Sequence, residues 1–600
     1  MKIIRALVFA LGLFTAVAYA QPTIGAITNA ASYSLSPLPN SSIAQGSFFT
    51  IFGTGLGPTA GATWKPYPIP TNLGGTTVNV TVGSTTLPVY LYYTAATQIN
   101  AVLPSITPAG TGTITVTYNN QTSATAPITV VAGSFGAFTL NQAGSGPGII
   151  TNASFVENYV TATAKPGDEI ILWGTGLGPA PDPSTEGTAG PCPTGCNFLT
   201  SNPNLVTVWV GSEKVVPDYA GRSQYTAEDE IYFKLPSDVK GCYVQVAVQM
   251  NPPGGTQVVS NFTSVAVDPT GPTCSDADGI NVSDLSAALA SKGSANVAAI
   301  GLLSNFLNLD IGGALNLQWA NDTVTANIAT FTQGVLRESE GFTLSPSANS
   351  CTVSPFRGYP PPSDPAVGAE TALTGALAGT SLSAKGPNGT QPVAESSNDK
   401  GYSGLVGGST IQDLLQGGGL APFFLTSAYG ISPGTYTVTA PGATVGAFAA
   451  SIDVSSSAAA FKWTNQSSVT GNTAGCLPTG STCIDRTQPL TITWTGGDPN
   501  GFVDITAIGS TVTASAGPVA GVTPGTLVEC MVPASAGTFT IPAFVLSALP
   551  STQGSASLIP PGELLVGPAS GATKVSPTPS GLDAAYIFYH FIQGLNVGWK

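Results

Sequence analysis

The sequence predicts an all-β protein built from several β-sandwiches in series. The hexapeptide Gly-Thr-Gly-Leu-Gly-Pro occurs twice, at residues 53–58 and 174–179, and each copy follows a strand-like apolar run. Apolar and polar residues alternate along segments such as 76–82, which is typical of half-buried strands. Gly, Pro, Ser and Thr are abundant between these segments, as expected for a chain with many turns.

The two hexapeptides belong to a duplicated unit. Val-Gly-Ser at 82–84 recurs at 210–212, and Leu-Pro at 103–104 recurs at 235–236, so the order of the motifs is kept while the loops between them lengthen. We expect two antiparallel sandwiches of immunoglobulin size, over residues 21–132 and 133–267. Their expected strands cover 48–52, 76–82, 89–93, 112–118 and 126–131, and then 169–173, 205–210, 230–235, 242–249 and 263–267.

Several motifs in the first 267 residues resemble a known family. They are Asn-Ala-Ala-Ser at 29–32, Ile-Ala-Gln-Gly-Ser at 43–47, Leu-Gly-Gly at 73–75, Gln-Ile-Asn at 98–100, and both hexapeptides. Together they resemble the Solibacter-type C-terminal domain of secreted acidobacterial proteins, which is related to immunoglobulin-like IPT/TIG modules. The resemblance covers residues 22–267 and implies the fold but no activity. Glu-Ile-Tyr at 230–232 replaces the usual second Gln-Val-Asn, and the N-terminal position is also unusual for this family.

The remainder of the chain divides into a mixed, mostly β, loop-rich third module at 268–455 and a C-terminal β-sandwich at 456–600. A short helix is expected at 283–291 with Ser283 as its cap, and long loops at 355–410. Strands are expected again from residue 434, and the apolar, aromatic segment 584–599 is expected to be a closing strand. Residues 434–438, 445–448 and 493–497 look like the carboxyl-terminal portion of other uncharacterised acidobacterial secreted proteins.

Composition and the N-terminus predict export. Lys2 and Arg5, an apolar stretch and Ala-Tyr-Ala at 18–20 form a secretory signal peptide at 1–20, with cleavage expected after Ala20. No Cys follows that position, and no later stretch has about 20 consecutive apolar residues, so neither a lipoprotein anchor nor a transmembrane segment is expected. Only 8% of residues are charged and the net charge is −14, which disfavours nucleic-acid binding.

Eight cysteines in an exported chain predict disulfides. Tight loops join Cys192 to Cys196 and Cys476 to Cys483, and a pair of Cys274 with Cys351 would bracket one module. Cys242 and Cys530 lie in strand-like runs and are expected to be buried thiols. Zinc is not expected, because the close pairs lack the spacing of a zinc knuckle and the chain has a single His.

Two loops invite comparison with ligand-binding motifs. The hexapeptide lacks the Gly-x-Gly-x-x-Gly spacing and the following helix of a dinucleotide site, so a structural turn is favoured and no cofactor is expected. Asp276, Asp278 and Asp284 resemble a calcium loop, because closely spaced carboxylates suit a hard cation. Positions 6 and 12 of that loop are Asn281 and Ala287 instead of Gly and Glu, which favours a polar linker over a metal site.

Catalytic residues are sparse. His590 is the one candidate base for a Ser-His-Asp triad, and its aromatic neighbours favour a core or edge histidine. Glycoside hydrolysis needs two facing carboxylates, for which Glu338, Glu340 and the cluster Glu228, Asp229 and Glu230 are the candidates. We interpret that cluster as a solvated loop that enters a strand.

Aromatic residues gather in the first unit and are candidates for stacking on sugar rings. They are Trp64, Tyr67, Tyr90 and Tyr92. Tyr90 and Tyr92 should share one face of a strand while Leu91 and Tyr93 share the other, so one of the two pairs should be core.

These features lead to a main hypothesis and two alternatives. The main one is a non-enzymatic exported protein of the cell surface or matrix, which acts in adhesion or in binding an extracellular polysaccharide or surface protein. One alternative is a polysaccharide-active, glycoside hydrolase-like protein with catalytic carboxylates in 268–455 and the sandwiches as accessory modules. The other is a structural spacer.

Overall fold

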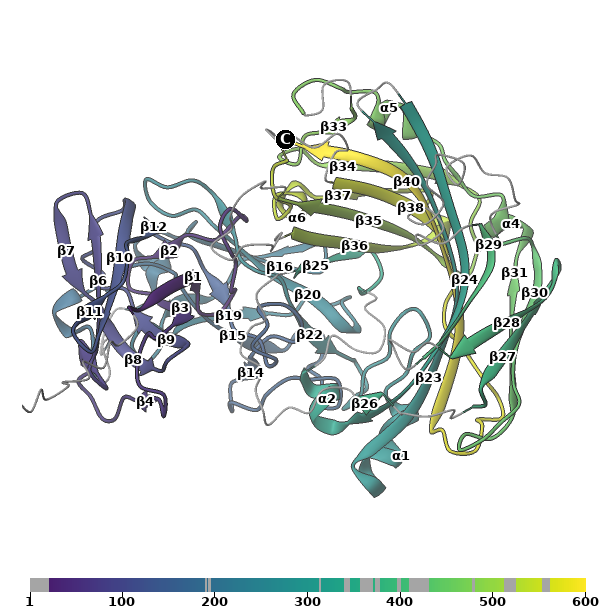
Figure 1. Ribbon diagram of the computed structural model, residues 1–600, viewed down its shortest axis with the longest axis horizontal. Helices are drawn as coiled ribbons and strands as arrows, with labels where there is room; N and C mark the ends of the chain where they lie inside the picture. The colour runs from purple at the N-terminus through teal and green to yellow at the C-terminus, as the bar shows by residue number, and fades with distance from the viewer. Residues whose placement is uncertain are drawn as a thin grey trace, which may run out of the picture.

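The computed structural model shows an all-β protein in three parts, two small β-sandwiches followed by a large curved sheet (Figure 1). It describes residues 21–188, 192, 196–311, 315–338, 346–356, 371–372, 378–395, 401–408, 431–476, 481–511, 525–552 and 562–600. The expected signal peptide, 1–20, lies outside these residues. No helix in the described part of the chain is long and apolar enough to cross a membrane.

The first sandwich consists of two sheets. One has the strand order β1-β3-β9-β8-β4, and the other has the order β2-β12-β10-β6-β5 with β7 on β6 and β11 on β10. The bounds are β1 (Thr23–Asn29), β2 (Ile43–Ala44), β3 (Phe48–Thr54), β4 (Ala62–Thr63), β5 (Asn72–Leu73), β6 (Thr76–Val82), β7 (Thr85–Pro88), β8 (Tyr90–Thr94), β9 (Gln98–Val102), β10 (Gly110–Tyr118), β11 (Gln121–Thr122) and β12 (Ala126–Val131). Every second residue of β6 is buried, so the alternation in the sequence places Val78 and Val80 in the core against Phe49 and Ile51.

The second sandwich repeats this plan with longer loops. Its sheets have the orders β13-β15-β19-β18, with β14 on β15, and β17-β16-β20-β21, with β22 on β20. The bounds are β13 (Gly136–Ala137), β14 (Ile150–Asn152), β15 (Glu169–Thr175), η1 (Pro183–Thr185), η2 (Phe198–Thr200), β16 (Val206–Val210), β17 (Glu213–Val215), β18 (Tyr219–Arg222), β19 (Asp229–Lys234), β20 (Gly241–Met250), β21 (Val258–Val259) and β22 (Thr263–Val267). Leu172, Val208, Ile231, Phe233 and Val246 fill the core between them. The two sandwiches are immunoglobulin-like and stand in tandem, as the duplication predicted.

The third part is dominated by one sheet with the strand order β25-β36-β35-β38-β40-β23-β24-β29-β28-β27-β30-β31. Its strands are β23 (Ser294–Ile311), β24 (Leu315–Thr332), β25 (Ser350–Phe356), β26 (Thr371–Ala372), β27 (Ser381–Gly386), β28 (Gly389–Glu395), β29 (Tyr402–Gly408), β30 (Gly434–Ala440), β31 (Phe448–Val454), β33 (Cys483–Ile484), β35 (Phe502–Ser510), β36 (Gly525–Pro533), β38 (Gly562–Ala569), β39 (Thr573–Lys574) and β40 (Ala584–Trp599). A smaller sheet contains β32 (Lys462–Trp463), β34 (Leu490–Thr495) and β37 (Thr538–Ile541). Short helices connect them, namely α1 (Ser283–Lys292), α2 (Gln333–Glu338), α4 (Ser456–Ala459), α5 (Gln466–Thr470), η4 (Ala534–Ala536) and α6 (Ala543–Leu546).

The large sheet crosses the predicted boundary at 455/456. Strand β40 pairs in parallel with β23 and antiparallel with β38, so the last strand of the chain lies between a strand of the third module and a strand of the C-terminal segment. The long hairpin of β23 and β24 was not predicted. The apolar residues of β23 show no clear period in the sequence, whereas β24 alternates between buried and more exposed residues from Ala320 to Ile328. The predicted loops at 355–410 are wrong in part, since β27, β28 and β29 lie there.

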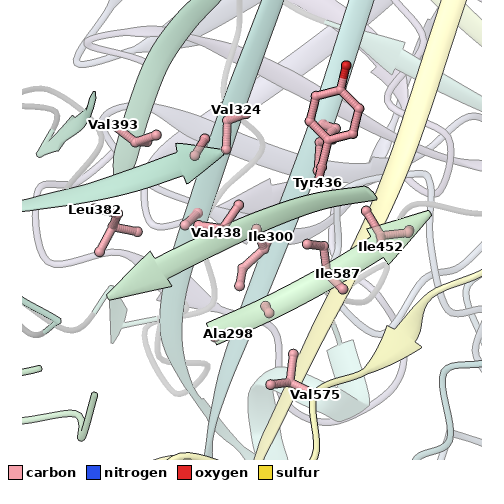
Figure 2. Close-up of a cluster of buried hydrophobic side chains, with 14 of the residues drawn as sticks. Ala298, Ile300, Val324, Leu382, Val393, Tyr436, Val438, Ile452, Val575 and Ile587 are labelled. Carbon is pink, nitrogen blue, oxygen red and sulfur yellow. The ribbon is translucent and has the colours of Figure 1, made fainter. Parts of the chain in front are cut away.

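Two apolar clusters hold this part together. In the first, side chains from β23, β24, β27, β30 and β31 face one another and meet Val575 and Ile587, so the curved sheet folds over its own core (Figure 2). In the second, Ile492 and Trp494 of the small sheet pack on Ile505, Val528 and Val566 of the large one. The small sheet therefore covers one end of the large sheet.

The structure contains four disulfides, so the prediction of disulfides is confirmed. Cys192 pairs with Cys196 and Cys476 with Cys483. The expected pair of Cys274 with Cys351 is wrong: Cys242 pairs with Cys274, and Cys351 with Cys530. Cys242 and Cys530 are therefore not thiols, because β25 places Cys351 opposite Cys530 and the segment after β22 brings Cys274 to Cys242.

Helix α1 also differs in detail from the prediction. Ser283 is its first residue and not its cap, since Val282 precedes the helix without a side-chain cap. The amide of Ser283 instead donates to the side-chain oxygen of Asn281, at 3.0 Å. The helix ends at Gly293, whose φ of 71° is left-handed, as is common after a helix C-terminus.

Candidate functional site

The second glycine-rich turn is held by a buried ion pair. Asp229 accepts hydrogen bonds from the amides of Gly176 and Leu177, at 2.7 and 2.8 Å, and its other oxygen lies 2.7 Å from Nη1 of Arg222. Arg222 also donates to the carbonyl of Gly178, at 2.7 Å. Burial raises the pKa of Asp229 to about 6, although Arg222 and the two amides favour its charged form. The turn is therefore fixed in place by this pair and offers its amides to no ligand.

A second buried carboxylate joins the two sandwiches. Glu186 accepts hydrogen bonds from the amide and the hydroxyl of Ser105, at 2.8 and 2.5 Å, and the Ser105 hydroxyl accepts one from the amide of Ala180. Burial raises the pKa of Glu186, against the lowering effect of these bonds. The amide of Phe48 donates to the hydroxyl of Thr175 across the same interface, at 2.9 Å.

The acidic cluster at 228–230 is not the solvated loop that the sequence suggested. Asp229 and Glu230 are buried, and Glu230 accepts a hydrogen bond from the hydroxyl of Tyr232, at 2.6 Å. Burial also raises the pKa of Glu228 to about 7. The cluster was misread because charged residues next to a strand are usually exposed, whereas here the loop folds against the first sandwich.

The aromatic residues of the first sandwich form a compact cluster with tilted rings. The ring of Trp64 meets that of Tyr67 edge-on, with centroids 4.5 Å apart and planes at 72°, and lies 4.8 Å from that of Tyr92. Tyr90 packs beside Gly187 of the second sandwich. The rings are half-buried and do not share a plane, so they make no flat strip for a sugar.

A bulge in β8 changes which of these residues face the core. The register between β8 and β9 shifts between Leu91 and Tyr93, so Tyr92 is the extra residue and strict alternation ends there. Leu91 is fully buried while Tyr93 is only half-buried. The prediction that Leu91 and Tyr93 share a face is therefore wrong.

The three aspartates of the calcium-like loop point to different partners. Asp276 accepts a hydrogen bond from the amide of Cys242, at 2.6 Å, while Asp284 lies 2.7 Å from the ammonium group of Lys574. Burial and the charge of Asp278 raise the pKa of Asp276. In the described part of the chain no three His, Cys, Asp or Glu side chains gather as metal ligands.

The remaining catalytic candidates lie in separate ion pairs. Nε2 of His590 is 3.0 Å from Asp504, which raises the pKa of the imidazole despite its burial. Glu338 lies beside Arg337, which also pairs with Glu157 of the second sandwich. Glu340 lies outside the described residues.

A cavity of about 410 Å³ opens where all three parts of the chain meet. The first sandwich contributes a loop, the second contributes its edge strand β21, and the third contributes residues near α6 and β25. Its lining residues are Ser34, Leu38, Pro39, Asn40, Gln257, Val258, Val259, Ser260, Asn261, Phe262, Val353, Pro355, Arg486, Thr487, Thr526, Ala543, Phe544, Ser547 and Ala548. Small-molecule sites of this size occur preferentially at such interfaces.

The wall of this cavity is built from a stack of aromatic rings. Phe544 of α6 stacks on Trp209 of β16, with centroids 4.2 Å apart and planes at 16°, and lies nearly parallel to Phe262. Trp209 is fixed in turn by a hydrogen bond from its indole N–H to Gln249, at 2.8 Å. The second sandwich and the C-terminal segment are thus packed together, which gives the cavity a fixed wall.

Arg486 is the one charged residue among the described residues that line the cavity. No sequence motif marks this residue, since an isolated arginine between two strand segments carries no recognisable signal. Its site consists of residues from three parts of the chain, which no local pattern reveals.

Comparisons with known proteins support the fold. Residues 31–131 match the IPT/TIG domain family, so the first sandwich contains an IPT/TIG immunoglobulin-like domain. A search of curated proteins finds no match. Among solved structures, a tandem pair of immunoglobulin domains of titin is 7% identical with a TM-score of 0.11, covering 38% of this chain and 91% of that one. Domains 5 and 6 of the S-layer protein SbsC are 15% identical with a TM-score of 0.14, covering 42% and 99%. At these scores neither likeness carries an argument about this chain.

Proposed function

We propose that this chain is a non-enzymatic, exported protein of the cell surface or extracellular matrix that acts through ligand binding or adhesion. The observation that carries this proposal is the cavity at the meeting point of the three parts, whose described lining residues include an arginine and no carboxylate. The four disulfides fit an oxidising compartment outside the cytoplasm. Membership of residues 22–267 in the Solibacter-type family is part of the same proposal.

The candidate carboxylates favour binding over glycoside hydrolysis. A glycosidase needs two carboxyl groups that face each other across a substrate, about 5 to 9.5 Å apart. Glu338 instead lies beside Arg337, and Asp229 is committed to Arg222 and two backbone amides. Both carboxylates are thus occupied by a neighbouring arginine, which is a structural role.

Polymer binding combined with product analysis tests this function. The chain 21–600 is screened on a glycan array and in pull-downs with insoluble polysaccharides, and reducing-sugar release is assayed on every ligand that binds. Binding without release is expected. Release of sugar would overturn the non-enzymatic assignment, and the absence of any binding would favour the spacer alternative.

A pair of variants tests whether polysaccharide binds at the aromatic cluster of the first sandwich. Trp64→Ala removes the central ring of the half-buried aromatic cluster, whereas Tyr225→Ala removes a ring that is 48% exposed on the second sandwich. If sugars bind to the cluster, only the first variant weakens binding. Equal effects would place the polymer elsewhere.

A further inference from the structure

The arginine in the junction cavity differs from the other arginines of the described chain. Arg222 pairs with Asp229, and Arg337 pairs with Glu157 and Glu338. No carboxylate lies within ion-pair distance of Arg486 among the described residues, although the chain as a whole carries a net charge of −14. Asp485, the preceding residue in the chain, acts on Arg486 electrostatically from beyond ion-pair distance.

The hydrogen bonds of Arg486 leave part of its guanidinium group unused. Nη1 donates to the carbonyl of Ser547, at 3.0 Å, while Nε is buried and has no hydrogen-bond partner in the described chain. The neighbouring carboxylate of Asp485 accepts bonds from the amide and hydroxyl of Thr487 instead, at 3.0 and 2.6 Å. Burial lowers the pKa of Arg486, but an arginine stays charged at neutral pH.

The other walls of the cavity suit an apolar body. Leu38 of the first sandwich, Val259 and Phe262 of the second, and Phe544 of the third part face the same space as Arg486. The side-chain amide of Asn261 is already committed, because it donates to the carbonyls of Ala137 and Gly144. The guanidinium group of Arg486 is the one charged group that the described lining offers to a ligand.

We propose that the junction cavity binds a small organic acid, whose carboxylate pairs with Arg486 and whose apolar body lies against Phe544, Phe262 and Leu38. This inference rests on the proposed ligand-binding function and names the class of ligand. A carboxylate matches the planar guanidinium group better than any uncharged acceptor does, and it would supply the ion-pair partner that Arg486 lacks among the described residues. Because all three parts line the cavity, the occupied site would also link them.

Ligand-observed NMR titrations with named probes test the proposal. Phenylacetate and 4-methylpentanoate are compared with their uncharged amides, and glucuronate serves as a carboxylate with a polar body. We expect both apolar acids to bind the chain 21–600 at least about tenfold more tightly than their amides, because a hydrogen bond to a charged group contributes strongly when desolvated. Glucuronate should bind more weakly than either. Tighter binding of glucuronate than of the apolar acids would indicate a site for acidic polysaccharide. It would overturn the proposal that the ligand is an organic acid with an apolar body.

Three variants test whether the acids bind in the junction cavity. Arg486→Gln should abolish the preference for acid over amide, whereas Lys385→Gln, which removes an exposed cation on β27, should leave it unchanged. Val259→Trp should fill the cavity and weaken acids and amides alike, which keeps the test valid if the Arg486 variant does not fold. Equal binding of acids and amides by the wild-type chain, or an unchanged preference in Arg486→Gln, overturns the proposal.

The outcomes also separate this proposal from the broader function. Polymer binding without binding of small acids leaves the adhesive role intact and removes the organic-acid site. Binding of small acids without polymer binding keeps the ligand-binding role and removes adhesion to polysaccharide. Failure of both assays would remove the proposed function itself.

Discussion

The first two sandwiches share a plan and a glycine-rich hexapeptide but differ sharply in charge. Residues 21–132 contain no Asp, Glu, His or Arg, and Lys65 is their one charged residue. The second sandwich contains Asp229 and Arg222, fully buried, and Glu186 at the interface. A β-sandwich of this kind therefore does not need ion pairs to fold, and the charges of the second one must serve another purpose.

The turn itself shows what that purpose is. In the first copy the amide of Leu56 donates to the carbonyl of Ala96, at 3.0 Å, and Thr97 at the strand position equivalent to Asp229 is exposed. In the second copy the turn faces the first sandwich, where the carbonyl of Gly178 lies beside Gly46. Backbone groups that lose water at an interface need replacement partners, and Asp229 and Arg222 provide them. Burial between sandwiches, and not the turn sequence, accounts for the ion pair.

The largest difference is expected from the matched variants Asp229→Asn and Thr97→Ala. The first leaves Arg222 buried without its counterion and should lower the free energy of unfolding of the second sandwich by about 3 to 5 kcal/mol. The second changes an exposed side chain and should have an effect within about 0.5 kcal/mol on the first sandwich. Peptide-resolved hydrogen exchange in urea measures both. Equal losses would contradict the difference drawn between the two turns.

The leucine of the hexapeptide should behave alike in both copies. Leu56 and Leu177 are buried, so replacing either with Ala leaves a cavity in the core of its own sandwich. We expect each variant to lose about 2 to 4 kcal/mol in that sandwich, by the same exchange experiment. A loss confined to one copy would show that the apolar role of the turn is not shared.

The contact between Ser105 and Glu186 should have a smaller effect. Ser105→Ala removes one hydrogen bond to the Glu186 carboxylate and leaves the amide of Ala180 without its acceptor, so we expect a loss of about 1 to 3 kcal/mol. Amide hydrogen exchange should accelerate in the segment 180–188 at a lower urea concentration than in the core of either sandwich. Thr81→Ala, at an exposed threonine of β6, is the control. No change at 180–188 would show that this contact does not couple the sandwiches.

The smallest effect is a pH dependence of stability that the second sandwich shows and the first does not. The folded pKa of Glu228 is about 7, above its value in the unfolded chain, so the folded state binds more protons between about pH 4.5 and 7. Stability should then fall by about 1 kcal/mol as the pH rises through this window, after solvent screening. Unfolding at a series of pH values should show a slope that Glu228→Gln reduces. The first sandwich, which has no carboxylate side chain, should show none.

The alternation of apolar and polar residues predicted those strands that have one buried face. Strands β6, β12 and β22 match their predicted bounds, because alternation along a strand records which face is buried. The long strand β23 was not predicted, since buried residues occur on both of its faces and leave no local period. Strand β24 alternates from Ala320 to Ile328, so a local signal for it was present in the sequence.

Long-range partners explain the other errors. The pairing of Cys351 with Cys530 follows from the register of β25 on β36, which only the folded sheet reveals. The bulge at Tyr92 and the burial of Asp229 likewise depend on neighbouring strands and on the first sandwich. The site around Arg486 could not be predicted for the same reason, since its lining residues come from three separate parts of the chain.

A double-mutant cycle on Arg222 and Asp229 tests most directly whether the charges of the second sandwich act as a structural pair. The free energy of unfolding is measured for Arg222→Met, Asp229→Leu, the double variant and the wild-type chain. If the pair stabilises the turn as described, each single variant leaves a buried charge unpaired, and the double variant loses less than the sum of the singles by about 2 kcal/mol or more. Additive losses would contradict this structural role. The difference in charge between two sandwiches of the same plan would then have no explanation.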